Sequence, residues 1–241
     1  MTARLTDADV KCWAPVAQVT DWLAAQIPEG ARVLEIGPGH IPFKRATDFV
    51  DIRELPNLPK GKTAICDLMV DPLPYPDKSF DFIYCRHVLE DVFDPFRLCR
   101  EMSRVGMRGY VETPSPIAEY VRGVDGGSPQ WRGYHHHRWL CWHDKGFLKF
   151  ASKFPIIEYV GDDADSSDDM IAVILRVGAL YWNTYHLWEG LINFRHLQCP
   201  QDFDITTGYA ELLRTAMTES KAASDKFQET LHQQRTARHG L

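Results

Sequence analysis

The stretch Val33-Leu34-Glu35-Ile36-Gly37-Pro38-Gly39 places an acid beside a glycine-rich turn, residue types that a ligand site can use. Val33, Leu34 and Ile36 form a short apolar run, which predicts a buried strand that Gly37-Pro38-Gly39 ends at once. Because glycine has no side chain, such a turn lets a ligand approach the backbone closely. The alternative is an ordinary strand followed by a tight turn.

Further polar residues follow the next three predicted strands. Asp51 lies near the end of the predicted strand 47–52, where a carboxylate can accept hydrogen bonds from both hydroxyls of a ribose. Asp67 and Leu68 directly follow the next strand, and His87 follows the one after that. A solvated loop aspartate is the alternative for Asp51, but the glycine turn before it favours the ribose.

A second group of reactive residue types lies within residues 131–143, which hold four histidines, two arginines, three tryptophans and a tyrosine. We weigh three interpretations of the histidines. They could bind a metal ion, since imidazole suits zinc, iron or nickel, and His135 and His137 would share a face of an extended chain that His136 would not. One could be a general base for an acceptor hydroxyl, with His135 or His137 as candidates and His143 in reserve. They could also be hydrogen-bonded residues of a partly buried aromatic loop.

The neighbours of these histidines suit a ligand with a flat or sugar-like face that carries negative charge. The substrate-binding candidates are Trp131, Arg132, Tyr134, Arg138 and Trp139.

The elements that must position these residues alternate along the first half of the chain. Apolar periodicity predicts helices at 7–27 and 94–105 and strands at 32–36, 47–52, 62–66, 79–85 and 109–114. Strict alternation of strands and helices is typical of a mostly parallel sheet. Later we expect a short helix at 115–123, a helix at 145–153, a hairpin of 155–160 with 170–177, and a long helix at 206–239. The aromatic segment 179–188 either lines an acceptor pocket or extends the core, and the acidic loop 161–169 either holds calcium or, more simply, is a solvated hairpin tip.

These motifs together resemble a class I S-adenosylmethionine (SAM) dependent methyltransferase of the type 11 kind. The resemblance rests on residues 33–39, Asp51, Asp67-Leu68, the segment 73–81 that leads into the fourth strand, and the segment 87–92 that follows it. It implies an α/β fold with a Rossmann-like, mostly parallel seven-stranded sheet, a C-terminal antiparallel hairpin and helices on both faces. It also implies SAM as cofactor, with the glycines Gly37 and Gly39 beside it. Glu35 would orient the methionine amine, Asp51 the ribose and Asp67 with Leu68 the adenine, while His87 would lie near the methionine end.

Two positions depart from the pattern. Ile41 stands in place of the family's third glycine, and Asp91 stands where many relatives carry a second histidine. SAM has no phosphate, so its site depends less on a phosphate-binding helix N-terminus, and the loss of the third glycine is tolerable.

Composition limits the function classes. The chain has 241 residues and a net charge of −6, which argues against a dedicated nucleic-acid binder. No apolar run is long enough to span a bilayer, and the start of the chain lacks a signal-peptide core. The six cysteines are scattered without a C-x-x-C pair, which fits a reduced, cytoplasmic protein.

From these observations we predict a methyltransferase domain at 1–178, with an acceptor-binding insert at about 115–150, and a helical extension at 179–241. The predicted reaction is O-methylation of a small molecule or saccharide, without a metal. The alternatives are an oxidoreductase that uses NAD(P) or a nucleotide sugar, and an inactive SAM-binding module that recruits a partner. The long C-terminal helix is a candidate surface for a homodimer.

Overall fold

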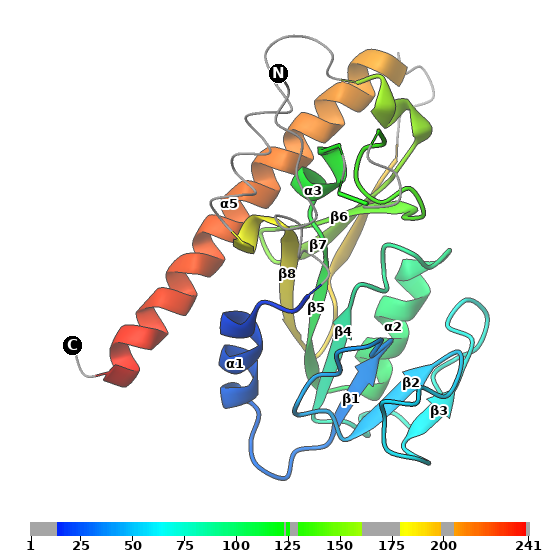
Figure 1. Cartoon of the computed structure of the whole chain (residues 1–241), viewed down its shortest axis with the longest axis vertical. Coiled ribbons are helices and arrows are strands. Elements are labelled where there is room, and N and C mark those ends of the chain that lie inside the picture. The colour runs from blue at the N-terminus through cyan, green and yellow to red at the C-terminus, as the bar shows by residue number, and fades with distance from the viewer. Residues whose placement is uncertain (1–13, 123, 126–129, 161–178, 199–204, 240–241) are drawn as a thin grey trace. The chain divides into compact units, whose positions relative to one another are not determined.

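The computed structural model describes residues 14–122, 124–125, 130–160, 179–198 and 205–239 (Figure 1). The chain divides into two compact units. The sheet unit consists of Ala14–Thr113 and Tyr185–Phe194. The described residues of the hairpin unit come from Pro114–Thr184 and Arg195–Leu241. The predicted domain boundary at residue 178 falls outside the described residues and stays a prediction.

A six-stranded sheet forms the centre of the sheet unit, in the order β3-β2-β1-β4-β5-β8. Its strands are β1 (Val33–Ile36), β2 (Asp48–Asp51), β3 (Thr63–Ile65), β4 (Phe82–Arg86), β5 (Arg108–Pro114) and β8 (Asn183–Glu189). Strands β1 to β5 run parallel, which confirms the five predicted strands. The chain adds β2 and β3 on one side of β1 and then adds β4 and β5 on the other side, so the strand order reverses between β1 and β4. Open α/β sheets bind ligands at such a switch point.

Two helices of the sheet unit are described, α1 (Ala17–Gln26) and α2 (Pro95–Val105). They lie within the helices predicted at 7–27 and 94–105. Residues 7–13 of the first predicted helix are outside the described part of the chain. Asp94 caps α2, because its Oδ1 accepts a hydrogen bond from the Arg97 N–H at 2.9 Å, and Pro95 occupies the first turn.

The expected strict alternation of strands and helices is wrong at the connections from β1 to β2, from β2 to β3 and from β3 to β4. These connections, residues 37–47, 52–62 and 66–81, contain no helix. Each segment contains proline, which removes a backbone donor and clashes with a preceding helical turn. These prolines are Pro38 and Pro42 in the first connection, Pro56 and Pro59 in the second, and Pro72, Pro74 and Pro76 in the third.

The predicted seventh strand and C-terminal hairpin are also not found among the described residues. Pro155–Glu158 is a 3₁₀ helix, η1, rather than a strand, and residues 161–178 lie outside the described residues. The sheet instead adds β8, which comes from the aromatic segment. The Tyr185 ring lies 6.5 Å from that of Tyr110, and Trp188 covers Gly109, where an added Cβ would lie 2.7 Å from the indole. These two aromatics therefore extend the core.

A second, three-stranded sheet has the order β6-β7-β9, with β6 at Trp139–Asp144, β7 at Phe147–Ser152 and β9 at Phe194–Leu197. The helix predicted at 145–153 is wrong. Lys145 (φ +48°) and Gly146 (φ +84°) form a two-residue turn of the kind that joins antiparallel strands. Leu148 and Phe150 are buried while Phe147 and Lys149 are less so, which is the period-two pattern of a strand.

The core of the hairpin unit gathers around the long helix α5 (Ile205–His239), which confirms the predicted C-terminal helix (Figure 1). Tyr209, Leu213 and Ala216 recur at helical spacing and are buried in one cluster with Tyr120 of α3 (Pro116–Tyr120) and Trp142. No helix in the described residues is long and apolar enough to cross a membrane. Self-association through α5 stays a prediction.

The turn between β6 and β7 gives a stability prediction. We expect Gly146→Ala to lower the free energy of unfolding by about 1 kcal/mol, because a side chain is disfavoured at positive φ. Lys145→Asn should raise it by a smaller amount, because asparagine tolerates this conformation better than lysine. Urea unfolding followed by tryptophan fluorescence measures both changes. Equal effects of the two substitutions would contradict the turn.

Candidate active site

The glycine turn after β1 has the conformation that glycine allows. Gly37 (φ +64°) donates its N–H to the Val50 carbonyl at 3.0 Å, and Gly39 has φ +55°. A Cβ at Gly37 would lie 2.6 Å from Val88 Cγ2, so the turn needs glycine there for both backbone and packing reasons. Nothing lies within 4 Å of a Cβ added at Gly39. The turn stands at the carboxyl end of β1, beside the switch point.

Glu35 is buried beneath this turn and holds the loop that follows it. Its Oε2 accepts a hydrogen bond from the Phe43 N–H at 2.8 Å, and the Phe43 ring stacks on Tyr84 with 4.3 Å between centroids. Burial raises the pKa of Glu35 to about 8, although the Phe43 hydrogen bond and Arg86 oppose the rise. Ile41 is 45% exposed, so the position of the missing third glycine has room for a side chain.

The two predicted nucleoside-binding acids stand at the same edge of the sheet. Asp51 ends β2 next to β1, is half-buried, and its Oδ1 accepts a hydrogen bond from the Arg53 N–H at 3.3 Å. Asp67 follows β3, and its Oδ1 accepts from the Met69 N–H at 2.9 Å. Arg97 of α2 donates to the carbonyl of Leu68 and so ties this segment to the helix. The cofactor roles of these residues stay predictions.

A buried ionic cluster that was not predicted from the sequence lies at the ends of β4 and β5. The Glu112 carboxylate accepts hydrogen bonds from Arg86 Nε at 3.0 Å and from the Tyr110 hydroxyl at 2.5 Å. His87 adopts φ +53°, and its Nε2 lies 3.9 Å from Glu112 Oε1. Burial raises the pKa of Glu112, against the opposing effect of Arg86. The signal in the sequence was an acid inside an apolar strand.

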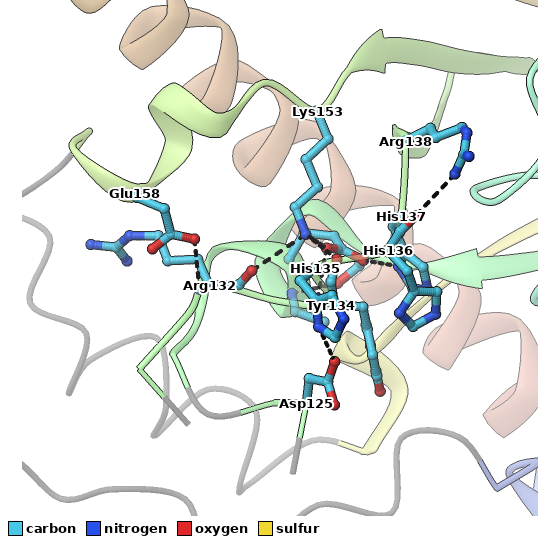
Figure 2. A network of polar contacts seen from close by, with 12 residues as sticks. Asp125, Arg132, Tyr134, His135, His136, His137, Arg138, Lys153 and Glu158 are labelled. Carbon is cyan, nitrogen blue, oxygen red and sulfur yellow. Dashed lines mark hydrogen bonds and ion pairs between the residues drawn. The ribbon is translucent and has the colours of Figure 1, made fainter. Parts of the chain in front are cut away.

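In the hairpin unit, the fully buried carboxylate of Glu119 lies against His137 and Lys153, two residues that Figure 2 labels. Glu119 Oε1 lies 2.5 Å from His137 Nδ1, and Oε2 lies 2.5 Å from Lys153 Nζ. Burial alone would raise the pKa of Glu119, but Lys153 and His137 lower it to about 2. Of the predicted catalytic histidines, His137 is therefore the one built into the interior.

The other two catalytic candidates lie elsewhere in the hairpin unit. His135 is exposed, and its Nδ1 lies 2.7 Å from Asp125 Oδ2. His143 lies in β6 opposite Leu148, and its Nε2 accepts from the Gly146 N–H at 3.4 Å. Six residues of nearly extended chain span roughly 20 Å, so β6 carries His143 away from His137.

The histidine run is a turn rather than an extended strand. The His137 N–H donates to the Tyr134 carbonyl at 3.2 Å. The rings of His135 and His136 are 5.5 Å apart, and those of His136 and His137 are 4.5 Å apart. The predicted alternation, with His136 on the opposite face, is therefore wrong.

The predicted substrate-binding residues differ in their exposure. Arg132 is 1% exposed, and its guanidinium donates to the Tyr120 carbonyl and stacks on that ring at 4.2 Å. Tyr134 is half-buried with its ring 4.6 Å from that of His137, whereas Arg138 is exposed. Trp131 is 45% exposed, and Trp139 is half-buried, with edge contacts to Phe150 and His196. Arg132 is thus part of the interior of the unit, while Trp131 and Arg138 reach its surface.

Known proteins provide an independent comparison. Residues 17–109 match a family model described as a methyltransferase domain. None of the curated proteins compared with the chain matches it.

Solved structures of SAM-dependent methyltransferases are also similar to the chain. One from Mesorhizobium loti is 26% identical, covers 42% of this chain and 57% of its own, and has a TM-score of 0.34. One from Archaeoglobus fulgidus is 21% identical, covers 70% of this chain and 91% of its own, and has a TM-score of 0.37. The chain thus spans little more than half the length of the Mesorhizobium protein.

The family match confirms the resemblance predicted from the motifs, and SAM is the cofactor that the family implies. The matched segment contains the glycine turn, Asp51 at the end of β2 and Asp67 after β3. Residues 17–109 of this chain are similar to a methyltransferase domain.

Proposed function

We propose that the chain transfers a methyl group from SAM to an oxygen atom of a small molecule or saccharide. One observation carries the SAM-binding part of this proposal. The glycine turn after β1, Asp51 at the end of β2 and Asp67 after β3 stand at the carboxyl ends of three adjacent parallel strands, in the order of the family motifs.

The donor groups at this edge fit the parts of SAM. Gly39, where an added Cβ would meet nothing within 4 Å, leaves its backbone open to the methionine part, and the Asp51 carboxylate can accept hydrogen bonds from the ribose hydroxyls. Asp67 can accept one from the adenine amine. Glu35 acts as a positioning residue through Phe43, and a contact of Glu35 with the methionine amine remains part of the proposal.

Bound SAM supplies a methyl group activated by its sulfonium. The protein then has to hold the acceptor oxygen in line with the methyl carbon, and such positioning can lower the barrier by several kcal/mol. A base is needed only to remove the acceptor proton. The Nδ1 atom of His135 lies beside the Asp125 carboxylate, and that of His137 beside the Glu119 carboxylate. Such a contact orients the ring as a base requires, so these two histidines are the candidates.

The first prediction concerns Gly37. We expect Gly37→Ala to raise the SAM dissociation constant at least about tenfold, because the new Cβ meets Val88 and is disfavoured at positive φ. Isothermal titration of the native chain and the variant with SAM and with S-adenosylhomocysteine measures the change. Gly61→Ala is the matched control, since Gly61 has φ +73° but nothing within 4 Å of an added Cβ.

The same titration separates the alternatives. Absence of SAM binding by the native chain, together with binding of NAD, would replace the proposal with an oxidoreductase. Binding of SAM without methyl transfer to any member of a broad acceptor panel would favour the inactive module.

The second prediction follows from the raised pKa of Glu35. The folded pKa of about 8 lies above the ordinary value of 4.5, so the folded chain retains a proton that the unfolded chain loses. We expect the free energy of unfolding to fall, relative to that of Glu35→Gln, as the pH rises from 4.5 to about 8, and to change no further above that. Glutamine can still accept from the Phe43 N–H. A constant difference across this range would contradict a protonated Glu35.

The third prediction tests the base. We expect one of His135→Gln and His137→Gln to lower the rate of acceptor-dependent S-adenosylhomocysteine formation about a hundredfold or more, with unchanged SAM affinity. Each variant is assayed with hydroxylated small molecules and saccharides. Retention of full turnover by both variants would show that neither histidine is the base.

A further inference from the structure

We propose that Asp125, His135 and His136 bind a divalent transition-metal ion. Each residue offers one ligand atom, and the three atoms lie within 4.8 Å of one another. Asp125 and His135 already approach closely, with 2.7 Å between Oδ2 and Nδ1. All three residues belong to the hairpin unit, so the proposal does not depend on the SAM site.

The donor set favours a particular class of metal. Two imidazoles and one carboxylate suit zinc, nickel, cobalt or iron(II) better than calcium or magnesium, which prefer oxygen. Metal–ligand bonds of about 2.0–2.2 Å place tetrahedral ligand atoms about 3.4 Å apart. The Asp125 and His135 atoms, 2.7 Å apart, therefore have to separate slightly, and the His136 atom, up to 4.8 Å away, has to approach, which a change in the torsions of the exposed His136 can provide. Three protein ligands leave a position for water or for an oxygen of a bound molecule.

Buried charges hold the backbone that presents His135 and His136. The Arg132 N–H donates to Glu158 at 3.0 Å, and Lys153 donates to the Tyr134 carbonyl at 2.6 Å (Figure 2). Lys153 also donates to Glu119. Gly133 (φ +56°) crosses directly over Glu119, where an added Cβ would lie 2.3 Å from Oε2. The turn that follows is therefore fixed before any ion binds, which reduces the entropy lost on binding.

The simpler interpretation is a surface ion pair between Asp125 and His135, which is worth about 0–1 kcal/mol. That interpretation involves two of the residues, whereas the donor atom of His136 belongs to the same group of three. Figure 2 shows His135 directed to Asp125, with His136 next to it. A bound ion would also engage His135, so the base of the proposed methyl transfer would then be His137.

The test uses the full chain produced without a polyhistidine tag and dialysed against a chelator. We expect titration with Zn²⁺ to show one ion per chain, and Co²⁺ to give a visible absorption band from the bound ion. The double variant His135→Asn/His136→Asn should lose this binding, and Asp125→Asn should weaken it at least about tenfold. The control His196→Asn/His232→Asn removes the same number of exposed imidazoles and should bind as the native chain does.

Unchanged Zn²⁺ affinity in His135→Asn/His136→Asn would overturn the proposal, and so would the absence of Zn²⁺ binding by the native chain. An equal loss in the control variant would show only nonspecific surface histidine binding, which also overturns it. Circular dichroism of each variant establishes that it is folded, and Asp125→Asn alone is decisive if the double variant is not.

Discussion

The hydrogen bond from the Phe43 N–H to the buried Glu35 carboxyl group determines how the sheet unit presents its ligand edge. It closes the loop after the glycine turn and sets the Phe43 ring on Tyr84, a residue of the neighbouring strand β4. The loop is thereby joined to both sides of the switch point without a third glycine. Because burial raises the pKa of Glu35 to about 8, this position responds to a nearby cation, which would favour its ionised form.

The hairpin unit uses a buried glutamate in the opposite way. Glu119 has a pKa of about 2, because Lys153 and His137 more than offset the effect of burial. A buried carboxylate with such partners is a permanent charge, and removing one partner from such a group costs roughly 3–5 kcal/mol. Glu119 therefore fixes the position of the histidine turn over the whole physiological pH range, whereas Glu35 can change its protonation within that range.

The sequence predicted the parts of the structure that local pattern determines. Strands β1 to β5 are apolar runs, and the acids after β2 and β3 follow from motif spacing. The helix predicted at 145–153 failed because two residues, Lys145 and Gly146, convert the segment into a hairpin. The Arg86–Glu112 pair was missed because 26 residues separate its members, so that only the register of β4 on β5 brings them together.

The same distinction explains why the cofactor was easier to infer than the acceptor. The cofactor edge is built from backbone conformation and from acids at strand ends, which leave a fixed spacing in the sequence. The histidine turn is built from side chains brought together by a buried network, and the same residues suit a base, a metal site or a packed loop. Composition alone cannot separate these three. The structure narrows them by burying His137 against Glu119 while leaving His135 and His136 exposed beside Asp125.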